Sequence, residues 1–559
     1  MNIAQKWSGQ VGNATLIAAL CGVILLAVST AFVWHDGLAS FADDSVSYLV
    51  MARYYSPYHA LAPAIAYSYT YETNYPPIFP LLLALVDGSH SYPIAHLVVA
   101  VCFTTAWMVY YFHLRLNTGS YWLALSVALL FATMPVVWTN LMGILSESLY
   151  LLLALVSIYI FDRQQTAPKN EHRYLATQAL LLTLAVLTRN VGIALVGAYV
   201  IATFLGAQPG KRLALRRYLP ALVAIIAVIM WPAIRPSGFE GLYSDILGDI
   251  LSKIGATESG SGNLLSSIQP QIAALYPAWA SSFLIYWTDD WTLRDGVVLL
   301  MAAGTFAGLV MRLLRNKIDA WYLLLYLIIV LVWPTSNQMQ RFLYPVIPFL
   351  LLQLIDAVVY LFGKASSFFR PTAVVAIPVF VMVTVTFPAL LFIYHRATFA
   401  SDLPYNQISE FYRVPDLGAA KKKARRHIEL FHDMESIRKA TRPEDVVIWY
   451  EPGYLALLAD RKGAAMPPVG DAGKFFTYIR ESGAKYVFLS TLHPRYTVNS
   501  NILNEWLRYF KGFTSTVWYR GDNEEKPDSI LLAVDHNALE SRYNAVTASQ
   551  NLSSVEIHE

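Results

Sequence analysis

Apolar positions up to about residue 395 are gathered into long blocks that short polar stretches separate. Examples are TLIAALCGVILLAVSTAFVW (15–34) and VVAIPVFVMVTVTFPALLFIY (374–394). About 18 consecutive apolar residues are enough for a helix to cross the hydrocarbon core of a bilayer. The pattern therefore predicts a polytopic α-helical membrane protein with about 11 or more transmembrane helices. The predicted spans are 14–34, 93–114, 120–138, 148–162, 174–188, 190–207, 218–234, 295–313, 320–334, 340–361 and 372–395.

Basic residues are unevenly distributed over the short loops between these spans. With the N-terminus in the cytoplasm, the cytoplasmic loops carry clusters such as KRLALRR (211–217), whereas Arg189 and Arg341 stand almost alone in the external loops. Such a bias sets the orientation of membrane proteins. It predicts a cytoplasmic N-terminus and a periplasmic or otherwise extracytoplasmic tail. Because 174–188 and 190–207 are short for full spans, we also expect a break or a re-entrant turn near Arg189.

Two long external loops, 35–92 and 235–294, interrupt the spans. In the first, DSVSYLVMARYY predicts a short helix that opens with Asp43, Asp44 and Ser45, residues that favour helix N-caps. Its apolar or aromatic positions have the spacing of one helix face; they are Val46, Leu49, Val50 and Tyr54. The later stretch YPPIFPLLLALV (75–86) is too short for a span and predicts an interfacial helix.

The tail from about residue 396 has a different composition. It contains charged residues and strand-like stretches DVVIWY (445–450), KYVFLS (485–490) and SILLAV (529–534), with the helix-like NILNEWLRYF (501–510) between the last two. Strands that alternate with helices indicate a small α/β domain. We therefore divide the chain into a transmembrane catalytic domain, 1–395, and an extracytoplasmic soluble α/β domain, 396–559.

Composition supports this interpretation and excludes several classes. Of the 559 residues, 56% are hydrophobic and 14% are charged, against about 25% charged in soluble domains. The only cysteines, Cys21 and Cys102, lie in predicted spans, so no disulfide framework or cysteine-based zinc cluster is expected. The absence of a P-loop, a dinucleotide fingerprint and an HExxH motif argues against an ATPase, a cytoplasmic nucleotide-sugar enzyme and a zincin.

Ionisable residues at the external ends of the spans are the candidates for chemistry, because charge at membrane depth is costly. Asp43 or Asp44 can act as a general base, and Arg189 and Arg341 can bind phosphate. Glu147 can hold an arginine, orient an acceptor or help to bind a metal. The structural alternatives stay open: the aspartates as helix caps, Glu147 as a link between helices, and the arginines as interfacial anchors or, for Arg189, as a partner of Glu147.

The order of these motifs resembles the GT-C class of membrane glycosyltransferases, in particular the bacterial relatives of protein O-mannosyltransferases that include the lipid A aminoarabinose transferases. The resemblance rests on the acidic pair after the first span, on YPP, and on three later segments: MGILSESLYLLL (142–153), LTRNVGIALV (187–196) and QRFLYPVIPFLL (340–351). It implies the GT-C fold and covers roughly residues 14–350. In the family an Asp-Glu pair has a tyrosine four residues after the aspartate. Asp44 and Tyr48 have that spacing, but Ser45 replaces the glutamate and Asp43 is additional.

The resemblance implies an inverting glycosyltransferase in the bacterial inner membrane, with a polyprenyl-phosphate sugar donor and a lipid, glycan or protein acceptor on the periplasmic side. Asp44, or else Asp43, would be the catalytic base, and Arg189 and Arg341 would bind the donor phosphate. Glu147, Tyr48, Tyr75 and Tyr344 would position the substrates. No cofactor is obligatory; a divalent metal, if one is used, would bind Asp43, Asp44 and Glu147. No nucleic acid is expected as a partner.

Two alternatives remain. A surface-polysaccharide polymerase or ligase would use a similar lipid-linked donor. A secondary transporter would also have about a dozen spans and intramembrane charges, but it should show internal repeats with matching broken helices. We find no hydropathy symmetry between the two halves of this chain, which disfavours the transporter.

Overall fold

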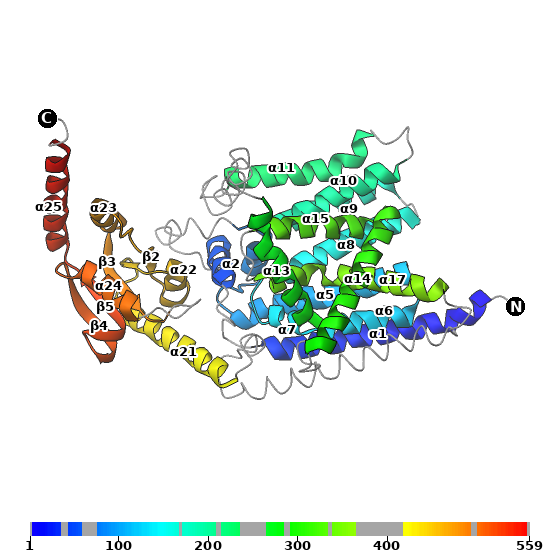
Figure 1. The fold of residues 1–559 in the computed structure, drawn as a ribbon, viewed down its shortest axis with the longest axis horizontal. Helices are drawn as coiled ribbons and strands as arrows, with labels where there is room; N and C mark the ends of the chain where they lie inside the picture. Colours follow the sequence, from blue (N-terminus) through cyan, green and yellow to red (C-terminus); the bar gives the residue numbers. More distant parts are fainter. Residues whose placement is uncertain are drawn as a thin grey trace. The chain divides into compact units, whose positions relative to one another are not determined.

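The computed structural model describes residues 3–34, 43–58, 75–166, 170–207, 214–234, 264–283, 291–333, 338–364, 417–492 and 500–555. The chain forms two compact units (Figure 1). The first comprises Met1–Ser40 and Asn74–Arg413, and the second comprises Phe41–Thr73 and Val414–Glu559. The second unit thus combines the tail with a segment of the first long loop, 35–92. The predicted domain boundary at 395/396 lies outside the described residues.

The described part of the first unit is helical, and its main helices pack side by side, α5 on α8, α9 on α11, α10 on α15 and α14 on α17. Its elements are α1 (Ile3–Val33), α4 (Ile78–Leu85), α5 (Tyr92–Thr118), α6 (Tyr121–Thr133), α7 (Pro135–Leu141), α8 (Glu147–Thr166), α9 (Glu171–Val186), η3 (Asn190–Gly192), α10 (Ile193–Gly206), η5 (Leu215–Tyr218), α11 (Leu219–Ile234), α13 (Leu264–Phe283), α14 (Trp291–Leu314), α15 (Ile318–Val332), α16 (Met339–Leu343), η8 (Tyr344–Val346) and α17 (Ile347–Lys364).

Helices occupy the places of ten predicted spans, while 372–395 lies outside the described residues. Five described helical stretches are long and apolar enough to cross a membrane, and a sixth is formed if the bent pair α6 and α7 counts as one. The five are Thr15–Val33, Tyr92–Thr118, Leu215–Ile234, Asp295–Leu314 and Met339–Leu361. The total of 11 or more spans therefore stays a prediction.

The segment predicted as one span, 120–138, consists of two helices, which together form either one broken span or a re-entrant pair. The chain bends by 56° between α6 and α7. The cause is Pro135, which has no N–H to donate and disfavours helical backbone in the residue before it. Met134 accordingly has φ −67° and ψ 136°, and the helix restarts in a new direction.

The predicted break near Arg189 is confirmed. Helix α9 ends at Val186, and Arg189 has extended backbone with φ −149° and ψ 136° before η3 and α10 begin. The short helix predicted in 75–86 is also present as α4. Its first amide, that of Ile78, donates to the carbonyl of Leu187 at 3.0 Å, so the YPP segment is tied to the break.

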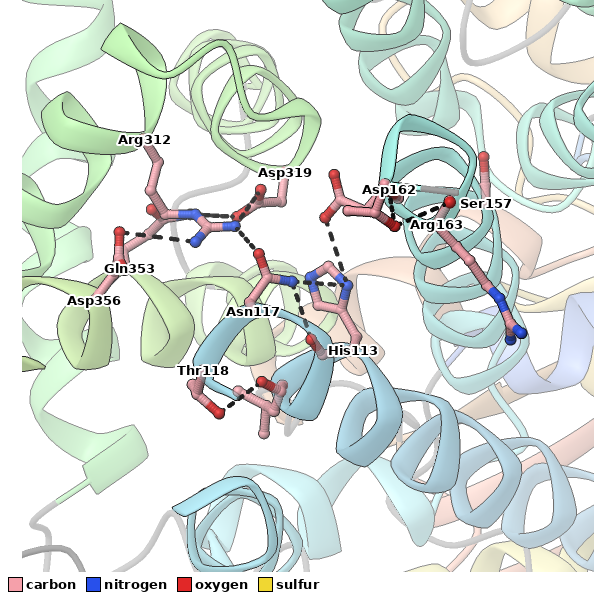
Figure 2. A network of polar contacts seen from close by, with 12 residues as sticks. His113, Asn117, Thr118, Ser157, Asp162, Arg163, Arg312, Asp319, Gln353 and Asp356 are labelled. Carbon is pink, nitrogen blue, oxygen red and sulfur yellow. Dashed lines mark hydrogen bonds and ion pairs between the residues drawn. The ribbon is translucent and has the colours of Figure 1, made fainter. Parts of the chain in front are cut away.

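A buried polar network joins α5, α14, α15 and α17 (Figure 2). Arg312 donates to both carboxylate oxygens of Asp319, through Nε at 2.9 Å and Nη2 at 2.8 Å. The same guanidinium donates to Asn117 Oδ1 at 2.9 Å, and Gln353 Nε2 donates to Asp319 Oδ2 at 2.9 Å. Both oxygens of this fully buried carboxylate therefore accept hydrogen bonds.

The network depends on a close approach of α14 to α17. At Gly308 a Cβ atom would overlap the carbonyl oxygen of Gln353. Gly308 lies one helical turn before Arg312, so the two residues share a face of α14. The absence of a side chain at residue 308 thus lets Gln353 and Arg312 reach the same carboxylate.

The second unit contains the predicted α/β domain. Its five strands have the order β2-β1-β3-β5-β4. Strand β1 is parallel to β2 and β3, whereas β5 is antiparallel to β3 and β4. The bounds are β1 (Val446–Ile448), β2 (Lys462–Ala464), β3 (Ala484–Ser490), β4 (Thr514–Asn523) and β5 (Lys526–Val534).

Helices complete this unit and supply much of its core, in which Phe475, Phe510 and Phe513 pack against apolar residues of the sheet. They are α21 (Leu417–Ala440), α22 (Pro452–Tyr454), the π-helical turn η10 (Leu455–Ala459), α23 (Ala472–Ser482), α24 (Ser500–Phe510) and α25 (His536–Val555). The strands expected at 445–450, 485–490 and 529–534 are confirmed as β1, β3 and β5, and the helix at 501–510 as α24.

Helix α2 (Asp43–Tyr55) belongs to this second unit and packs against α22 and η10. The expected apolar face is correct for Val46, Leu49 and Val50, which are buried, but wrong for Tyr54, which is 40% exposed. Tyr48 and Met51 are buried as well. The prediction of a single apolar face was incomplete, because buried side chains occupy more than one face of α2.

Candidate functional site

Glu147 is the centre of the candidate site in the first unit. It is the first residue of α8 and is 1% exposed. The carbonyl of Ser146 accepts the amide of Tyr150 at 3.0 Å, so the helix begins at this point. A helix N-terminus carries partial positive charge, which favours a carboxylate there.

Two arginines from separate elements converge on this carboxylate. Arg189 Nη1 lies 2.8 Å from Glu147 Oε1, and Arg341 Nε donates to the same oxygen. The arginine side chains are 14% and 10% exposed. Arg189 stands at the break between α9 and η3, and Arg341 is on α16. The structure therefore brings together three residues that the sequence analysis proposed one by one.

The second oxygen of Glu147 is in a different situation. Oε2 is buried and has no hydrogen-bond partner among the described residues. An orphaned buried acceptor is costly, and such groups are concentrated where a protein binds a ligand, an ion or water. Glu147 thus holds both arginines with one oxygen and leaves the other for a group outside the described chain.

Neutral polar side chains surround the three charges. Arg189 Nη1 donates to Ser146 Oγ at 3.2 Å, and Arg341 Nη1 is 3.4 Å from Gln338 Oε1. Ser148 Oγ and the hydroxyl of Tyr344 form a hydrogen bond of 3.2 Å. The sequence analysis missed Ser146, Ser148 and Gln338. The two serines flank Glu147 in an apolar stretch, which was the available signal.

The predicted tyrosines have different surroundings. Tyr344 is fully buried in η8, and its partner Ser148 is next to Glu147. Tyr75 is half-buried just before α4, whose Ile78 is tied to Leu187. Tyr344 therefore lies beside the site by direct contact, and Tyr75 precedes a segment that is fixed to the Arg189 break.

The acidic pair lies in the second unit. Asp43 is the first residue of α2, Asp44 is half-buried, and Tyr48 is 2% exposed one turn later. Ser45, expected to contribute to the cap, instead has a buried Oγ without a hydrogen-bond partner among the described residues. The position of both aspartates at a helix start agrees with the sequence analysis, and their roles stay predictions.

The proposed metal ligands Asp43, Asp44 and Glu147 are divided between the two units. Within the described ranges there is no group of three or more His, Cys, Asp or Glu side chains placed to hold a metal ion. A divalent metal on these three residues therefore stays a prediction.

The structure resembles known membrane transferases. ArnT from Cupriavidus metallidurans, in a structure bound to undecaprenyl phosphate, matches with a TM-score of 0.52 at 11% identity, over 93% of this chain and 97% of that chain. The oligosaccharyltransferase AglB from Archaeoglobus fulgidus, in complex with an inhibitory peptide and a dolichol-phosphate, matches with a TM-score of 0.50 at 14% identity, over 91% of this chain and 73% of that chain.

A scan of protein-family models and a search of curated proteins found no match. The structural likeness extends over nearly the whole chain at very low identity, so it speaks for the fold. It confirms the resemblance that the order of motifs indicated: the chain has the fold of the GT-C class of membrane glycosyltransferases.

Proposed function

We propose that this protein is an inverting glycosyltransferase of the membrane, which moves a sugar from a polyprenyl-phosphate donor to an external lipid, glycan or protein acceptor. The observation that carries the proposal is the pair of arginines, Arg189 and Arg341, gathered on one buried carboxylate. The lipid phosphates bound by ArnT and AglB support the class of donor.

The arginine pair suits a phosphate leaving group. A guanidinium has five N–H donors in a rigid fork and forms bidentate contacts with phosphate. As the donor breaks down, negative charge grows on the departing phosphate, and fixed positive groups stabilise that charge. Glu147 holds the two guanidinium groups together, which reduces the reorganisation needed when the donor binds.

Asp44 is the proposed general base. It would take the proton from the acceptor hydroxyl while the acceptor oxygen forms a bond to the anomeric carbon. The bond from that carbon to the phosphate oxygen breaks in the same step, and its electron pair stays with the phosphate. A single displacement of this kind inverts the anomeric centre. The additional aspartate, Asp43, is the alternative base.

The test is a transfer assay with the purified full-length protein and a panel of polyprenyl-phosphate sugars. Asp44→Asn keeps the shape of the side chain but removes the base, so we expect transfer to fall by about 10²-fold or more, with donor binding retained. Asp43→Asn serves as the matched variant and should be milder. A fully active Asp44→Asn protein together with an inactive Asp43→Asn protein would reverse the assignment.

The donor panel also tests the class of substrate. Polyprenyl-phosphate sugars should be consumed and polyprenyl phosphate released in equal amounts with product. Transport of a sugar without cleavage of its phosphate bond would contradict the proposal and favour the transporter alternative.

A further inference from the structure

Helix α2 is held by the second unit at its C-terminal end. Arg53, in the last turn, donates from Nη1 to Asp460 Oδ1 at 3.0 Å and to the carbonyl oxygen of Ala456 at 3.2 Å. The Arg53 side chain is 12% exposed. One guanidinium therefore links α2 to both a side chain and the backbone of a segment more than 400 positions later in the sequence.

The segment that receives Arg53 has an unusual backbone. Leu455–Ala459 form a π-helical turn, which ends at Asp460 with φ 52° and ψ 43°. Left-handed backbone is disfavoured for most residues, but aspartate tolerates it better than most. Turns of π-helix are rare and occur often at functional sites. The chain thus adopts a locally costly conformation where it meets Arg53.

Arg461 fixes this turn to the rest of the second unit. Its Nη1 donates to the carbonyls of Ala459 and Asp460, at 3.2 and 2.9 Å. Its Nη2 donates to the carbonyls of Arg438 and Thr441 in and just after α21, both at 2.6 Å. The partner of Arg53 is therefore part of a hydrogen-bonded connection that continues into α21.

The geometry of α2 relates this connection to the acidic pair. Asp44 and Arg53 are nine residues apart, which in an α-helix is about 14 Å along the axis and two and a half turns. Their Cβ atoms therefore lie on opposite sides of the helix. The contacts of Arg53 with Ala456 and Asp460 limit the shift and rotation of α2 within the second unit. They do not cover the side of the helix that carries Asp44.

We infer that Arg53 is a positioning residue and that the C-terminal domain, through Asp460 and the turn before it, serves to hold the helix of the acidic pair. The inference rests on the proposed role of Asp44 as base. A general base must lie within hydrogen-bond reach of its proton, and a displacement of about 1 Å can reduce a rate by about 10²-fold. The contacts of Arg53 restrict the movement of α2 within the second unit, and a segment of a long loop without such contacts would lack that restriction.

The experiment compares Arg53→Gln, Asp460→Asn and the double variant in the full-length protein. Asparagine also tolerates left-handed backbone, so Asp460→Asn removes the charge without forcing a new turn. Lys485→Gln is the matched control, because Lys485 lies on β3 and pairs with Asp445 in the same unit, outside the Arg53–Asp460 contact. The measurements are kcat, KM for the donor, Tm, and hydrogen exchange of the α2 amides.

We expect kcat to fall about tenfold or more in Arg53→Gln, with KM for the donor and Tm nearly unchanged and with faster exchange of the α2 amides. Arg53→Lys should restore part of the rate. The double variant should be no slower than the slower single variant, because both changes break one connection. Lys485→Gln should leave kcat and the α2 amides as they are.

Unchanged kcat and unchanged exchange in Arg53→Gln would overturn the inference, and so would additive losses in the double variant. The exchange measurement separates this result from a failure of the proposed function. If the unmodified protein transfers no sugar, the positioning role is lost with the proposed function. The anchor itself is then judged by the exchange of α2 alone.

Discussion

Two buried carboxylates of the first unit, Glu147 and Asp319, show opposite uses of the same chemistry. Asp319 receives Arg312 in a two-point contact and Gln353 in addition, so both of its oxygens are satisfied. Glu147 receives two arginines on Oε1 alone, and its Oε2 has no hydrogen-bond partner in the described part of the chain. The Asp319 carboxylate is therefore bound wholly within the chain, whereas Glu147 keeps one acceptor oxygen for a group outside the described residues, such as a water or a ligand.

The two carboxylates also differ in their position. Glu147 begins α8, whereas Asp162, at the Asp319 side of the unit (Figure 2), lies fifteen residues later on the same helix. Fifteen residues of α-helix span about 22 Å. The proposed ligand site and the structural network are therefore at opposite ends of one helix, and mutations can separate their effects.

The largest expected effect concerns the structural network. Asp319→Asn removes the charge that pairs with buried Arg312, and loss of one partner of a buried ion pair typically costs about 3–5 kcal/mol. We expect a large fall in Tm in detergent, with unchanged transfer activity for each folded molecule. Glu171→Gln, which breaks an exposed pair with Arg216, is the control and should change Tm little. An equally stable Asp319→Asn protein would remove the distinction between the two carboxylates.

The next effect concerns donor binding. Arg341→Ala or Arg189→Ala should weaken binding of the lipid-phosphate donor by about 1.5–3 kcal/mol, roughly ten- to a hundredfold. Lysine at either position should restore only part of the affinity, since it lacks the bidentate fork. Arg163→Ala, at the other end of α8, is the control. Unchanged donor affinity in both variants would assign these arginines to a structural role.

A smaller effect of opposite sign is expected at Glu147. Glu147→Gln removes a buried negative charge beside the proposed phosphate position, so the affinity for the donor lipid phosphate should rise, by less than the loss expected for either arginine variant. Transfer should nevertheless slow, because the arginines lose the group that orients them. Weaker phosphate binding would show that orientation outweighs the repulsion.

The smallest effect is expected at the ion pair between Asp445 and Lys485 in the second unit. Here the carboxylate is buried, as in Glu147 and Asp319, but its basic partner is exposed. Burial raises the pKa of Asp445, but hydrogen bonds from Lys485 and from the Arg442 amide, with the charges of both residues, outweigh it and leave the pKa below its ordinary 3.8. The hydrogen bond to Asp445 raises the pKa of Lys485 above its ordinary 10.5.

The sign of the pH dependence follows from these two directions. The contribution of the pair to stability is fully present between pH 3.8 and pH 10.5. It is lost as pH falls through the lowered pKa of Asp445 or rises through the raised pKa of Lys485. Lys485→Gln should therefore lower the Tm of this unit slightly at pH 7 and not below the pKa of Asp445. A difference that persists in strong acid would contradict the pairing.

The sequence predicted the elements well because apolar length and period are local properties. It identified Glu147, Arg189 and Arg341 as separate candidates, because a charge at the end of an apolar run is visible without a partner. It also proposed that Glu147 could hold an arginine, but it did not predict that Arg189 and Arg341 both bind this carboxylate, since Glu147 and Arg341 are 194 positions apart and no local pattern specifies such a pair. The bend at Pro135 was visible in the sequence, but the span prediction counted only apolar length.

The grouping of α2 with the tail was not predictable for a related reason. The apolar residues of α2 predict that the helix is buried, but the hydrophobic effect is not directional and does not specify which segment covers it. The connection from Arg53 to Asp460 depends on the backbone of a π-helical turn, which has no recognised sequence signature. Strand β2 was missed because its three residues, Lys-Gly-Ala, include no β-branched or aromatic residue, unlike the equally short Val-Val-Ile of β1. Strand β4 was missed because it lies at the edge of the sheet, where polar residues alternate with apolar ones.

Gly308 gives the Asp319 network a dependence on shape as well as on charge. Any residue with a Cβ at this position would push α14 away from α17 by meeting the carbonyl of Gln353, and Arg312 would move with it. A single uncharged methyl group, which takes no part in the hydrogen bonds of the network, would thereby separate a guanidinium from its carboxylate. The ion pair between Arg312 and Asp319 therefore depends on residue 308 having only a hydrogen atom as its side chain.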